Sequence, residues 1–438
     1  MVQGATIAFV HSPFQLKIPT NPPFSDADLG WVHQEINALF LKKVISPSQH
    51  EPGEFISPIF LVDKKDGGKR LILNLRKLNE HVEYHHFKMH GIAHILKLVT
   101  RNCFMAVIDI KDAYYSVPID PAFQKYFIWN GVLLQFCVFP NGLSPAPRFY
   151  TKLMKPVMAN LRELGHINSI YIDDIYLQGD DFPDCRHNVT DTVTSLVSLG
   201  FCPHPEKSHI LPSQEIDILG FCINSTTMLV SLTTRKRDGL LQDIVQLLGK
   251  GRLRVRELAV LIGKLVAAFP AVQYGPLFYR HLEENKQVGL TASQGNYEGF
   301  TTLTCEAREE LQWWLQHLPT AHSPIILASP TVEIFTDASD DGWGVHFDDV
   351  ETGGGWSSAE VALHINVKEI LAVYFGLQSM ANDVQNVNMR LFIDNTSIVS
   401  IIKHMGTSHN VELNKITKDI WLWAKARNIW LFPVYVPS

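Results

Sequence analysis

Two adjacent acidic residues, Asp173 and Asp174, interrupt an apolar stretch and constrain the chain more than any other feature. Residues 167–172 and 175–177 on either side are rich in Ile, Tyr and Leu, which favour β-strands. We therefore expect a tight hairpin with both carboxylates at its tip. Two ionised carboxylates in a half-buried site repel each other, so the pair predicts a bound divalent cation. The alternative is a solvated turn, in which Asp is common.

A third carboxylate, Asp109, ends the apolar run of residues 104–108, which predicts a buried strand with an acid at its carboxyl end. Magnesium prefers oxygen ligands and is usually held by a few carboxylates together with substrate phosphates. Two such ions about 3.5–4 Å apart activate an attacking hydroxyl and stabilise the leaving oxygen in phosphoryl transfer. Asp109, Asp173 and Asp174 together predict a site for two Mg²⁺ ions, with Mn²⁺ as a substitute.

Six motifs in order resemble those of reverse transcriptases. They occupy residues 64–70, 109–115, 139–149, 171–174, 205–207 and 219–221. The resemblance covers roughly residues 30–235 and implies an α+β right-hand polymerase with fingers, palm and thumb. The residues at 141–149 and 219–221 are most similar to DIRS-like retrotransposons, with gypsy-like elements second.

The same resemblance implies that Asp109 and Asp173 hold the two metal ions, with Asp174 in a supporting role. Lys207 matches the lysine proposed in polymerases to protonate the leaving pyrophosphate, although an exposed lysine is also ordinary at a surface. The motif that matches the primer grip consists of Leu219, Gly220 and Phe221.

Four residues match nucleotide-binding positions of the family: Lys64, Arg70, Tyr114 and Asn141. Lys64 and Arg70 would meet the triphosphate from a basic hairpin turned at Gly67-Gly68; the alternative is a merely solvated hairpin. Tyr114 would lie beneath the sugar and exclude a 2′-hydroxyl, or it is a core aromatic. Asn141 stands where family members often carry Gln. Its side chain is one methylene shorter, so its amide reaches less far toward nucleotide or template.

A second acidic series lies near the C-terminus. Asp337 and Asp394 each end a short apolar run, and Glu369 lies in an amphipathic segment between them. Strand-Asp, helix-Glu and strand-Asp resemble the α/β RNase H fold, which also binds two metal ions. Taken by itself, each of two acids has an alternative, purely structural role. Glu369 would pair with Asn366 in a capping box, and Asp394 would cap a helix that starts near Thr396.

RNase H-like domains of this kind carry a fourth acid on a helix after their last core strand. Residues 428–436 are typical of that strand, and the sequence stops at Ser438. We therefore expect an RNase H-like domain that lacks its last helix, with its hybrid-cleaving activity impaired by the truncation.

These landmarks divide the chain into four parts. We expect an extended leader over residues 1–30, fingers and palm over 31–232, a helical thumb and connection over 233–328, and the RNase H-like domain over 329–438. A helix is expected to open the second part at residues 31–44. Trp313 and Trp314 are expected to pack in the core of the third part.

Composition excludes several other classes of protein. Hydrophobic residues at 46% and charged residues at 19% indicate globular material, and the six cysteines lack the C-x-x-C spacing of a zinc site. Cys202, His204 and His209 come nearest to a metal cluster, which we do not favour. No apolar run reaches the ~18–20 residues that span a bilayer, and the N-terminal residues lack the charged region followed by an apolar stretch that is typical of a signal peptide. We expect an intracellular protein, cytoplasmic or nuclear and not secreted.

The formal charge of −6 is unusual for a protein that binds nucleic acid. Carboxylates at metal sites contribute to that sum, and basic residues gather locally at residues 64–76 and 235–256. We expect an RNA-directed DNA polymerase of a retrotransposon that acts on dNTPs and an RNA or DNA template with its primer, with other retroelement proteins as further partners. The alternatives are a decayed or domesticated copy that binds nucleic acid without catalysis, and a polymerase of pararetroviral type.

Overall fold

The computed structural model describes residues 4–52, 54–63, 68–123, 125–407 and 410–437. The chain forms two compact units, each with its own sheets and helices. The first comprises Met1–Leu219 with Ile223–Thr227, and the second comprises Gly220–Cys222 with Met228–Ser438. Within the described part of the chain, no helix combines the length and apolar character needed to cross a membrane.

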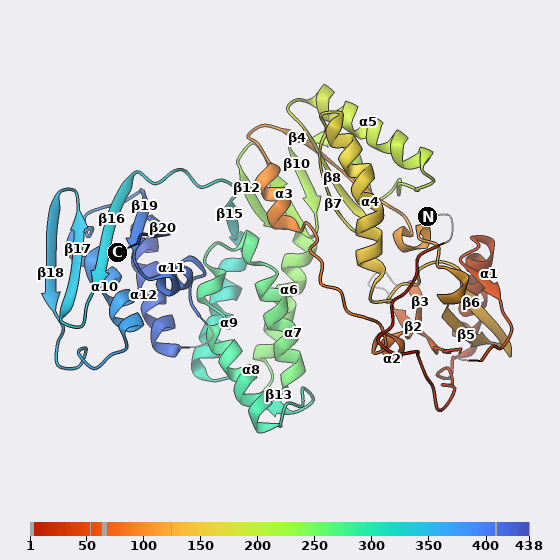
Figure 1. The fold of residues 1–438 in the computed structure, drawn as a ribbon. Helices are drawn as coiled ribbons and strands as arrows, with labels where there is room; N and C mark the ends of the chain where they lie inside the picture. The colour runs from red at the N-terminus through yellow and green to blue at the C-terminus, as the bar shows by residue number, and fades with distance from the viewer. Residues whose placement is uncertain (1–3, 53, 64–67, 124, 408–409, 438) are drawn as a thin grey trace. The chain divides into compact units, whose positions relative to one another are not determined.

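The first unit alternates helices with short strands (Figure 1). Its elements are α1 (Asp26–Leu41), β1 (Ile45–Pro47), β2 (Ile59–Asp63), β3 (Lys69–Leu73), α2 (Arg76–Asn79), α3 (Ile92–Leu98), β4 (Phe104–Asp109), β5 (Lys125–Trp129), β6 (Val132–Phe136), α4 (Ala146–Glu163), β7 (Ile167–Tyr171), β8 (Asp174–Gly179), α5 (Phe182–Ser198), β9 (His209–Ser213) and β10 (Glu215–Ile218).

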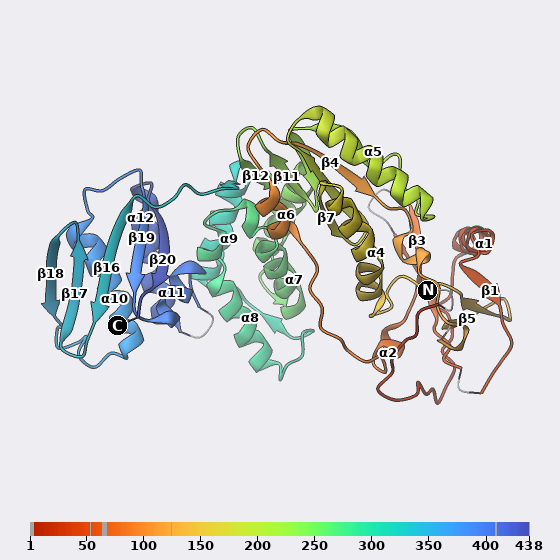
Figure 2. The same cartoon turned by 45° about the horizontal axis from the view of Figure 1, so that its top comes forward.

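An antiparallel sheet in the order β7-β8-β4-β9 forms the centre of this unit. Helices α4 and α5 pack against it (Figure 2). Strands β4 and β8 carry its most buried residues, because both run through the middle of the sheet with helices over them. The predicted strand ending at Asp109 and the predicted hairpin around Asp173 and Asp174 are confirmed.

Helix α1 begins at Asp26, five residues before the predicted start at Trp31. The Ser25 side chain accepts a hydrogen bond from the Asp28 amide and so caps the helix at its first turn. The helix ends at Leu41, before the predicted end at residue 44, and Lys43 follows with φ of 57°. The segment predicted as an extended leader to residue 30 therefore includes the first turn of a helix.

Strands β2 and β3 form an antiparallel hairpin in which Asp63 faces Lys69. Lys69 is paired with carboxylates, since its ammonium lies 2.6 Å from Asp28 and 3.4 Å from Asp63. Lys64 and Gly67, which the sequence placed at the turn of this hairpin, lie outside the described residues.

The second unit begins with a cluster of helices and ends with a mixed sheet. Its elements are β11 (Phe221–Asn224, shared with the first unit), β12 (Leu229–Leu232), α6 (Thr234–Leu248), β13 (Leu253–Arg254), α7 (Val255–Val266), α8 (Arg280–Ala292), β14 (Phe300–Thr301), α9 (Cys305–His317), β15 (His322–Pro324), β16 (Val332–Ala338), β17 (Gly342–Phe347), β18 (Val350–Gly355), α10 (Ile365–Met380), β19 (Asn388–Ile393), α11 (Thr396–Lys403), α12 (Val411–Ala426) and β20 (Trp430–Tyr435).

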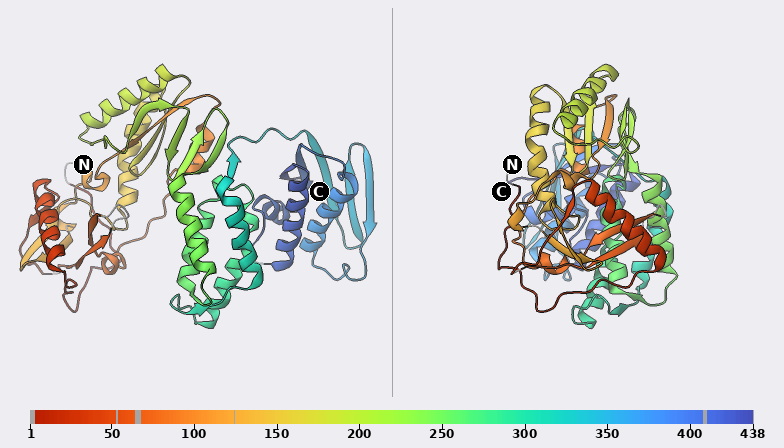
Figure 3. Two further views of the ribbon diagram at one scale, coloured as in Figure 1. Left: turned by 180° about the vertical axis from the view of Figure 1, so that it is seen from behind. Right: turned by 90° about the vertical axis from the view of Figure 1, so that its right-hand side faces the viewer.

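Helices α6, α7, α8 and α9 pack side by side (Figure 3). Leu240, Ile244 and Leu247 of α6 are buried, as expected for the apolar face of an amphipathic helix. Trp314 is fully buried and donates a hydrogen bond of 2.8 Å to the Phe278 carbonyl. Trp313 stacks on the Phe278 ring with centroids 3.9 Å apart, so both tryptophans pack within the protein as predicted.

The C-terminal sheet has the order β18-β17-β16-β19-β20. Strands β16, β19 and β20 are parallel, whereas β17 and β18 are antiparallel to their neighbours. Helix α10 packs on β16 and β17, and helices α11 and α12 pack on β20 (Figure 1). The strand predicted over residues 428–436 is β20.

Substitution of Gly179 tests how tightly α5 packs on the central sheet. A Cβ atom there would lie 2.2 Å from the backbone nitrogen of Cys185 in the first turn of α5. We predict that Gly179→Ala lowers the free energy of unfolding by about 1–3 kcal/mol, because rigid backbone must move.

Gly30→Ala in α1 is the matched control, because no atom lies within 4 Å of its added Cβ. In that exposed helix, Ala should raise the free energy of unfolding by about 0.5–1 kcal/mol. Urea denaturation of both variants measures the two effects. Equal stability of the two variants would contradict the packing described.

Candidate active site

A cleft of about 440 Å³ in the first unit gathers most of the predicted polymerase residues. The sequence-predicted residues that line it are Arg70, Asp109, Tyr114, Asn141, Asp173 and Lys207. They come from β3, β4 and the segments that follow β4, β6, β7 and α5. Residues spread over much of the first unit thus meet in one cavity.

The β7–β8 hairpin places Asp173 at its tip. Tyr171 pairs with Asp174 in the antiparallel ladder, which leaves Ile172 and Asp173 as the two residues of the turn. Ile172 has φ of 53°, an unfavourable conformation for a β-branched residue. Such strain persists only where the surrounding structure imposes it, and it is concentrated at functional sites.

The neighbouring strand fixes Asp109 beside this turn. Asp109 pairs with Asp174 across the β4–β8 ladder, so their side chains leave the same face of the sheet. The Ile110 amide donates to the Asp173 carbonyl at 2.9 Å, and the Ser208 hydroxyl accepts from the Asp109 amide at 3.0 Å. Backbone hydrogen bonds therefore set the relative positions of the acids.

The electrostatics of these acids favour a cation. Burial, reinforced by the charges of Asp173 and Asp109, raises the pKa of Asp174 to about 6. Burial also raises the pKa of Asp173, with a further contribution from Asp109, and Lys207 opposes both shifts. Carboxylates that destabilise each other's charged form fit divalent cations, which would restore that form.

Tyr114 lies on the floor of the cleft beside Asp173. Its ring meets the buried Tyr150 ring edge-on, with centroids 5.9 Å apart. Burial and the nearby charge of Asp173 raise the pKa of Tyr114 to about 12, which keeps the phenol neutral. Tyr115 also lines the cleft and packs against the core of the first unit, as the sequence indicated.

The predicted primer-grip residues lie where the two units divide in sequence. Leu219 and Gly220 have φ of 52° and 80°, so the chain turns sharply there. Within the second unit, the Lys236 ammonium lies 3.9 Å from the centre of the Phe221 ring. The φ of 80° accounts for glycine at position 220, and a Cβ there would also meet the Lys236 side chain at 2.8 Å.

The second acidic series also converges. Among the described residues, ligand atoms gather within 4.8 Å in two groups of three, of which one is Asp337, Glu369 and Asp394. The carboxylates of Asp109, Asp173 and Asp174 do not form such a group, and Asp174 does not line the cleft. Cys202, His204 and His209 are not gathered in this way either.

The capping alternatives for Glu369 and Asp394 are wrong. His364 caps α10, and Asn366 lies inside the helix, where its oxygen accepts from Asn395. Asn395 caps α11 by accepting from the amides of Ser397 and Ile398. Neither Glu369 nor Asp394 is therefore needed to cap a helix.

Buried oxygen atoms in this cluster lack hydrogen-bond partners. Glu369 Oε2 and Asp394 Oδ1 are both buried without one among the described residues. Burial, together with the charges of Asp394 and Asp337, raises the pKa of Glu369 to about 8. A divalent cation between the three carboxylates would satisfy these oxygens and favour their charged forms.

The sequence analysis missed the other group of three, which is His166, His187 and Asp191. His187 and Asp191 are spaced i,i+4 on α5, which is the signal that could have found them. His166 comes from before β7, and nothing local in the sequence indicates that it would join them.

Part of the chain is similar in sequence to known proteins. Residues 62–223 match the family model described as "Reverse transcriptase (RNA-dependent DNA polymerase)". The chain is 25% identical over 202 residues to the retrovirus-related Pol polyprotein from transposon gypsy of Drosophila melanogaster. It is 26% identical over 209 residues to the Pro-Pol polyprotein of Simian foamy virus type 1. These alignments cover 44% and 45% of the chain but only 19% and 18% of the relatives.

Solved structures extend the likeness of the fold to almost the whole chain. A foamy viral protease-reverse transcriptase in complex with dsDNA has a TM-score of 0.62 at 17% identity, and covers 99% of this chain and 88% of that one. The same kind of protein in complex with an RNA/DNA hybrid has a TM-score of 0.61 at 18% identity, and covers 98% of this chain and 56% of that one.

The fold is thus that of a right-hand polymerase with mixed α and β content. Asp109 and Asp173, the carboxylates that line the cleft, lie inside the matched segment. Residues 62–223 are therefore similar to reverse transcriptase domains, and the chain has homologues in gypsy and foamy virus Pol proteins.

Proposed function

We propose that the protein is an RNA-directed DNA polymerase of a retroelement. In the reaction, the primer 3′-hydroxyl attacks the α-phosphorus of a dNTP in line, a new P–O bond forms, and pyrophosphate leaves. The observation that carries the proposal is the cleft itself, where Asp109 and Asp173 meet Arg70, Tyr114 and Lys207. Phosphoryl transfer depends mainly on positioning and charge neutralisation, for which this set of residues is suited.

Asp109 and Asp173 are the proposed metal ligands, with Asp174 supporting them from the facing strand position. Two Mg²⁺ ions, or Mn²⁺ in their place, would activate the hydroxyl and stabilise the leaving oxygen when bound. Lys207 lies in the same cleft and is the proposed proton donor to pyrophosphate. Its positive charge already opposes the raised pKa values of Asp173 and Asp174.

The remaining cleft residues are proposed to select the nucleotide. Arg70 offers a forked contact to the triphosphate, and Asn141 offers an amide to nucleotide or template. Tyr114, backed by Tyr150, is placed to close the space that a 2′-hydroxyl needs. Base pairing chooses the base, so template and primer, whether RNA or DNA, are held mainly through their backbones.

We propose that Leu219, Gly220 and Phe221 contact the primer. In the second unit, we propose that Asp337, Glu369 and Asp394 bind a divalent ion. The domain boundaries at residues 30, 232 and 328 are proposed on the motif order. Because the chain spans about a fifth of its curated relatives, the activity of the whole protein and its other retroelement partners remain proposals.

A DIRS-like retrotransposon is the proposed source, on the residues at 141–149 and 219–221. An intracellular location, cytoplasmic or nuclear, is proposed because the cysteines show no disulfide-framework spacing.

A decayed copy is disfavoured by the presence of Arg70, Asp109, Tyr114 and Asp173 in one cleft. A pararetroviral-type polymerase would use the same cleft residues.

Asp173→Asn tests the polymerase site. Removing the charge should weaken metal binding at the hairpin tip and lower primer extension at least 10³-fold, because charge stabilisation supplies much of the catalysis. Extension of a labelled DNA primer on an RNA template with Mg²⁺ measures the rate. Asp180→Asn, in an exposed position just after β8, is the control and should extend at the wild-type rate. Near-normal extension by Asp173→Asn would refute the assignment.

Tyr114→Val tests the selection of sugar. Without the ring, ribonucleotides should compete better, and the ratio of kcat/KM for dCTP to that for CTP should fall at least tenfold. Steady-state single-nucleotide incorporation gives both constants. Tyr84→Val, at a residue that is 84% exposed, should leave the ratio unchanged. An active Tyr114→Val enzyme with the wild-type ratio would remove Tyr114 from this role.

The raised pKa of Glu369 predicts how stability depends on pH. A carboxyl whose pKa rises from 4.5 to about 8 on folding favours the folded state only while it is protonated. In metal-free protein this contribution is complete below pH 4.5 and is lost as pH rises toward 8. The loss should amount to about 1–3 kcal/mol.

Thermal denaturation between pH 5 and 8, in a chelating buffer and then with Mg²⁺, measures this effect. Metal-free wild type should lose stability as pH rises, and Mg²⁺ should restore it at pH 8. Glu369→Gln, which stays neutral, should show a shallower slope and less gain from Mg²⁺. Identical slopes in the two proteins would disprove the buried repulsion at this cluster.

A further inference from the structure

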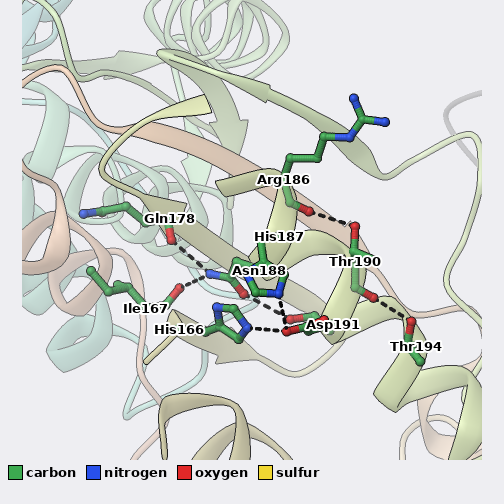
Figure 4. Close-up of polar contacts among 10 residues, drawn as sticks. His166, Ile167, Gln178, Arg186, His187, Asn188, Thr190, Asp191 and Thr194 are labelled. Atoms are coloured by element: carbon green, nitrogen blue, oxygen red, sulfur yellow. Dashed lines mark hydrogen bonds and ion pairs between the residues drawn. The ribbon is translucent and has the colours of Figure 1, made fainter. Parts of the chain in front are cut away.

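His166, His187 and Asp191 form a compact group of ligand atoms on the first unit (Figure 4). Asp191 Oδ2 lies 2.8 Å from His166 Nε2 and 3.2 Å from His187 Nε2. The two imidazole rings meet edge-on, with centroids 5.3 Å apart and planes at 89°. Both rings therefore direct Nε2 at the same carboxylate oxygen.

The three residues come from two elements that the sheet holds together. His187 and Asp191 are one turn apart on α5, so their side chains project from the same face of the helix. His166 directly precedes β7, the first strand of the hairpin that carries Asp173. About 17 Å of strand separates it from that tip, at roughly 3.3 Å per residue, so the group is distinct from the polymerase cleft.

Asn188 fixes the register between these two elements. Its side-chain amide, which is 1% exposed, donates to the carbonyls of Ile167 and Gln178 at 2.9 Å each. The Thr192 hydroxyl donates to its oxygen at 3.2 Å. Because Asn188 follows His187 and Ile167 follows His166, these bonds hold the two halves of the group in place (Figure 4). Ligands supported in this way are preorganised.

A hydrogen-bonded ion pair explains this arrangement less completely than a metal ion does. His166 alone, with a side chain 6% exposed, would satisfy Asp191. The exposed His187 nevertheless directs its Nε2 at the same oxygen instead of at solvent. Two imidazoles and one carboxylate form a common ligand set for Zn²⁺. Tetrahedral zinc with bonds of 2.0–2.2 Å places its ligand atoms about 3.3–3.5 Å apart, so His166 Nε2 would move about 0.5 Å away from Asp191 Oδ2 to admit the ion.

We propose that His166, His187 and Asp191 form a binding site for Zn²⁺ or a similar first-row divalent ion, open to solvent at its remaining position. The side chain of His187 is 69% exposed and that of Asp191 is 33% exposed, so the ion can enter from solvent and keep a water ligand. Nitrogen ligands favour such ions over Mg²⁺, which prefers oxygen. The bound ion would clamp α5 to the start of the β7–β8 hairpin.

The test is the amount of zinc bound in excess Mg²⁺, because Mg²⁺ fills the carboxylate sites without competing well for imidazole. The full chain is equilibrated with Zn²⁺ and Mg²⁺, desalted, and its zinc content is measured by mass spectrometry. His187→Ala and Asp191→Asn alter exposed or half-exposed side chains and should each lose one zinc ion per chain. His187→Cys replaces one zinc ligand with another and should retain it.

His322→Ala, at an exposed histidine of the second unit, is the matched control and should bind as much zinc as wild type. Zinc should also raise the thermal midpoint of wild type and His322→Ala but not that of His187→Ala. Equal zinc content in all variants, or no zinc retained by wild type, would overturn the proposal. Primer extension in Mg²⁺ alone should be the same in wild type and His187→Ala. The zinc measurement therefore tests this site separately from the polymerase assignment.

Discussion

Repulsion between acids held close together is the constraint on which the first unit depends. The β4–β8 ladder sets Asp109 opposite Asp174, and the turn adds Asp173 beside them. The strands that carry these acids are almost wholly buried, so the carboxylates cannot separate without disrupting the central sheet. Burial and mutual charge raise their pKa values, and divalent cations relieve both effects. The architecture that makes the site costly without metal is also what holds the proposed metal ligands together.

In the C-terminal sheet, other strands and a helix likewise hold three carboxylates close together. Two parallel strands end at or near Asp337 and Asp394, and α10 brings Glu369 between them. Here the acids gather within 4.8 Å and leave buried oxygen atoms unpaired, whereas the polymerase acids lie farther apart. In the cleft, substrate phosphates can supply the missing ligands, as is usual for Mg²⁺ in polymerases. In the tighter cluster of the second unit, more of the ligands of a bound ion would come from the carboxylates themselves.

The sequence predicted those features that depend on residues close together in the chain. Apolar runs ending in Asp identified β4, β16 and β19, because a strand and its terminal acid are neighbours in the chain. The start of α1 was placed too late because the decisive signal, the Ser25 cap, precedes the apolar face. The His166 group could not be predicted, since its register depends on the buried amide of Asn188 reaching two separate strands. Long-range placement of this kind appears only when the sheet has formed.

The net charge also follows from the two acidic clusters. The chain has 44 acidic and 38 basic residues, an excess of six carboxylates. Six carboxylates form the two acidic clusters, namely Asp109, Asp173 and Asp174 with Asp337, Glu369 and Asp394. The rest of the chain is therefore formally neutral, so any attraction for nucleic acid must arise from where its cations lie. Arg70 and Lys207 line the cleft, and Arg235, Lys236 and Arg237 lie in the first turn of α6. Contacts between such local groups of cations and phosphates weaken as the salt concentration rises.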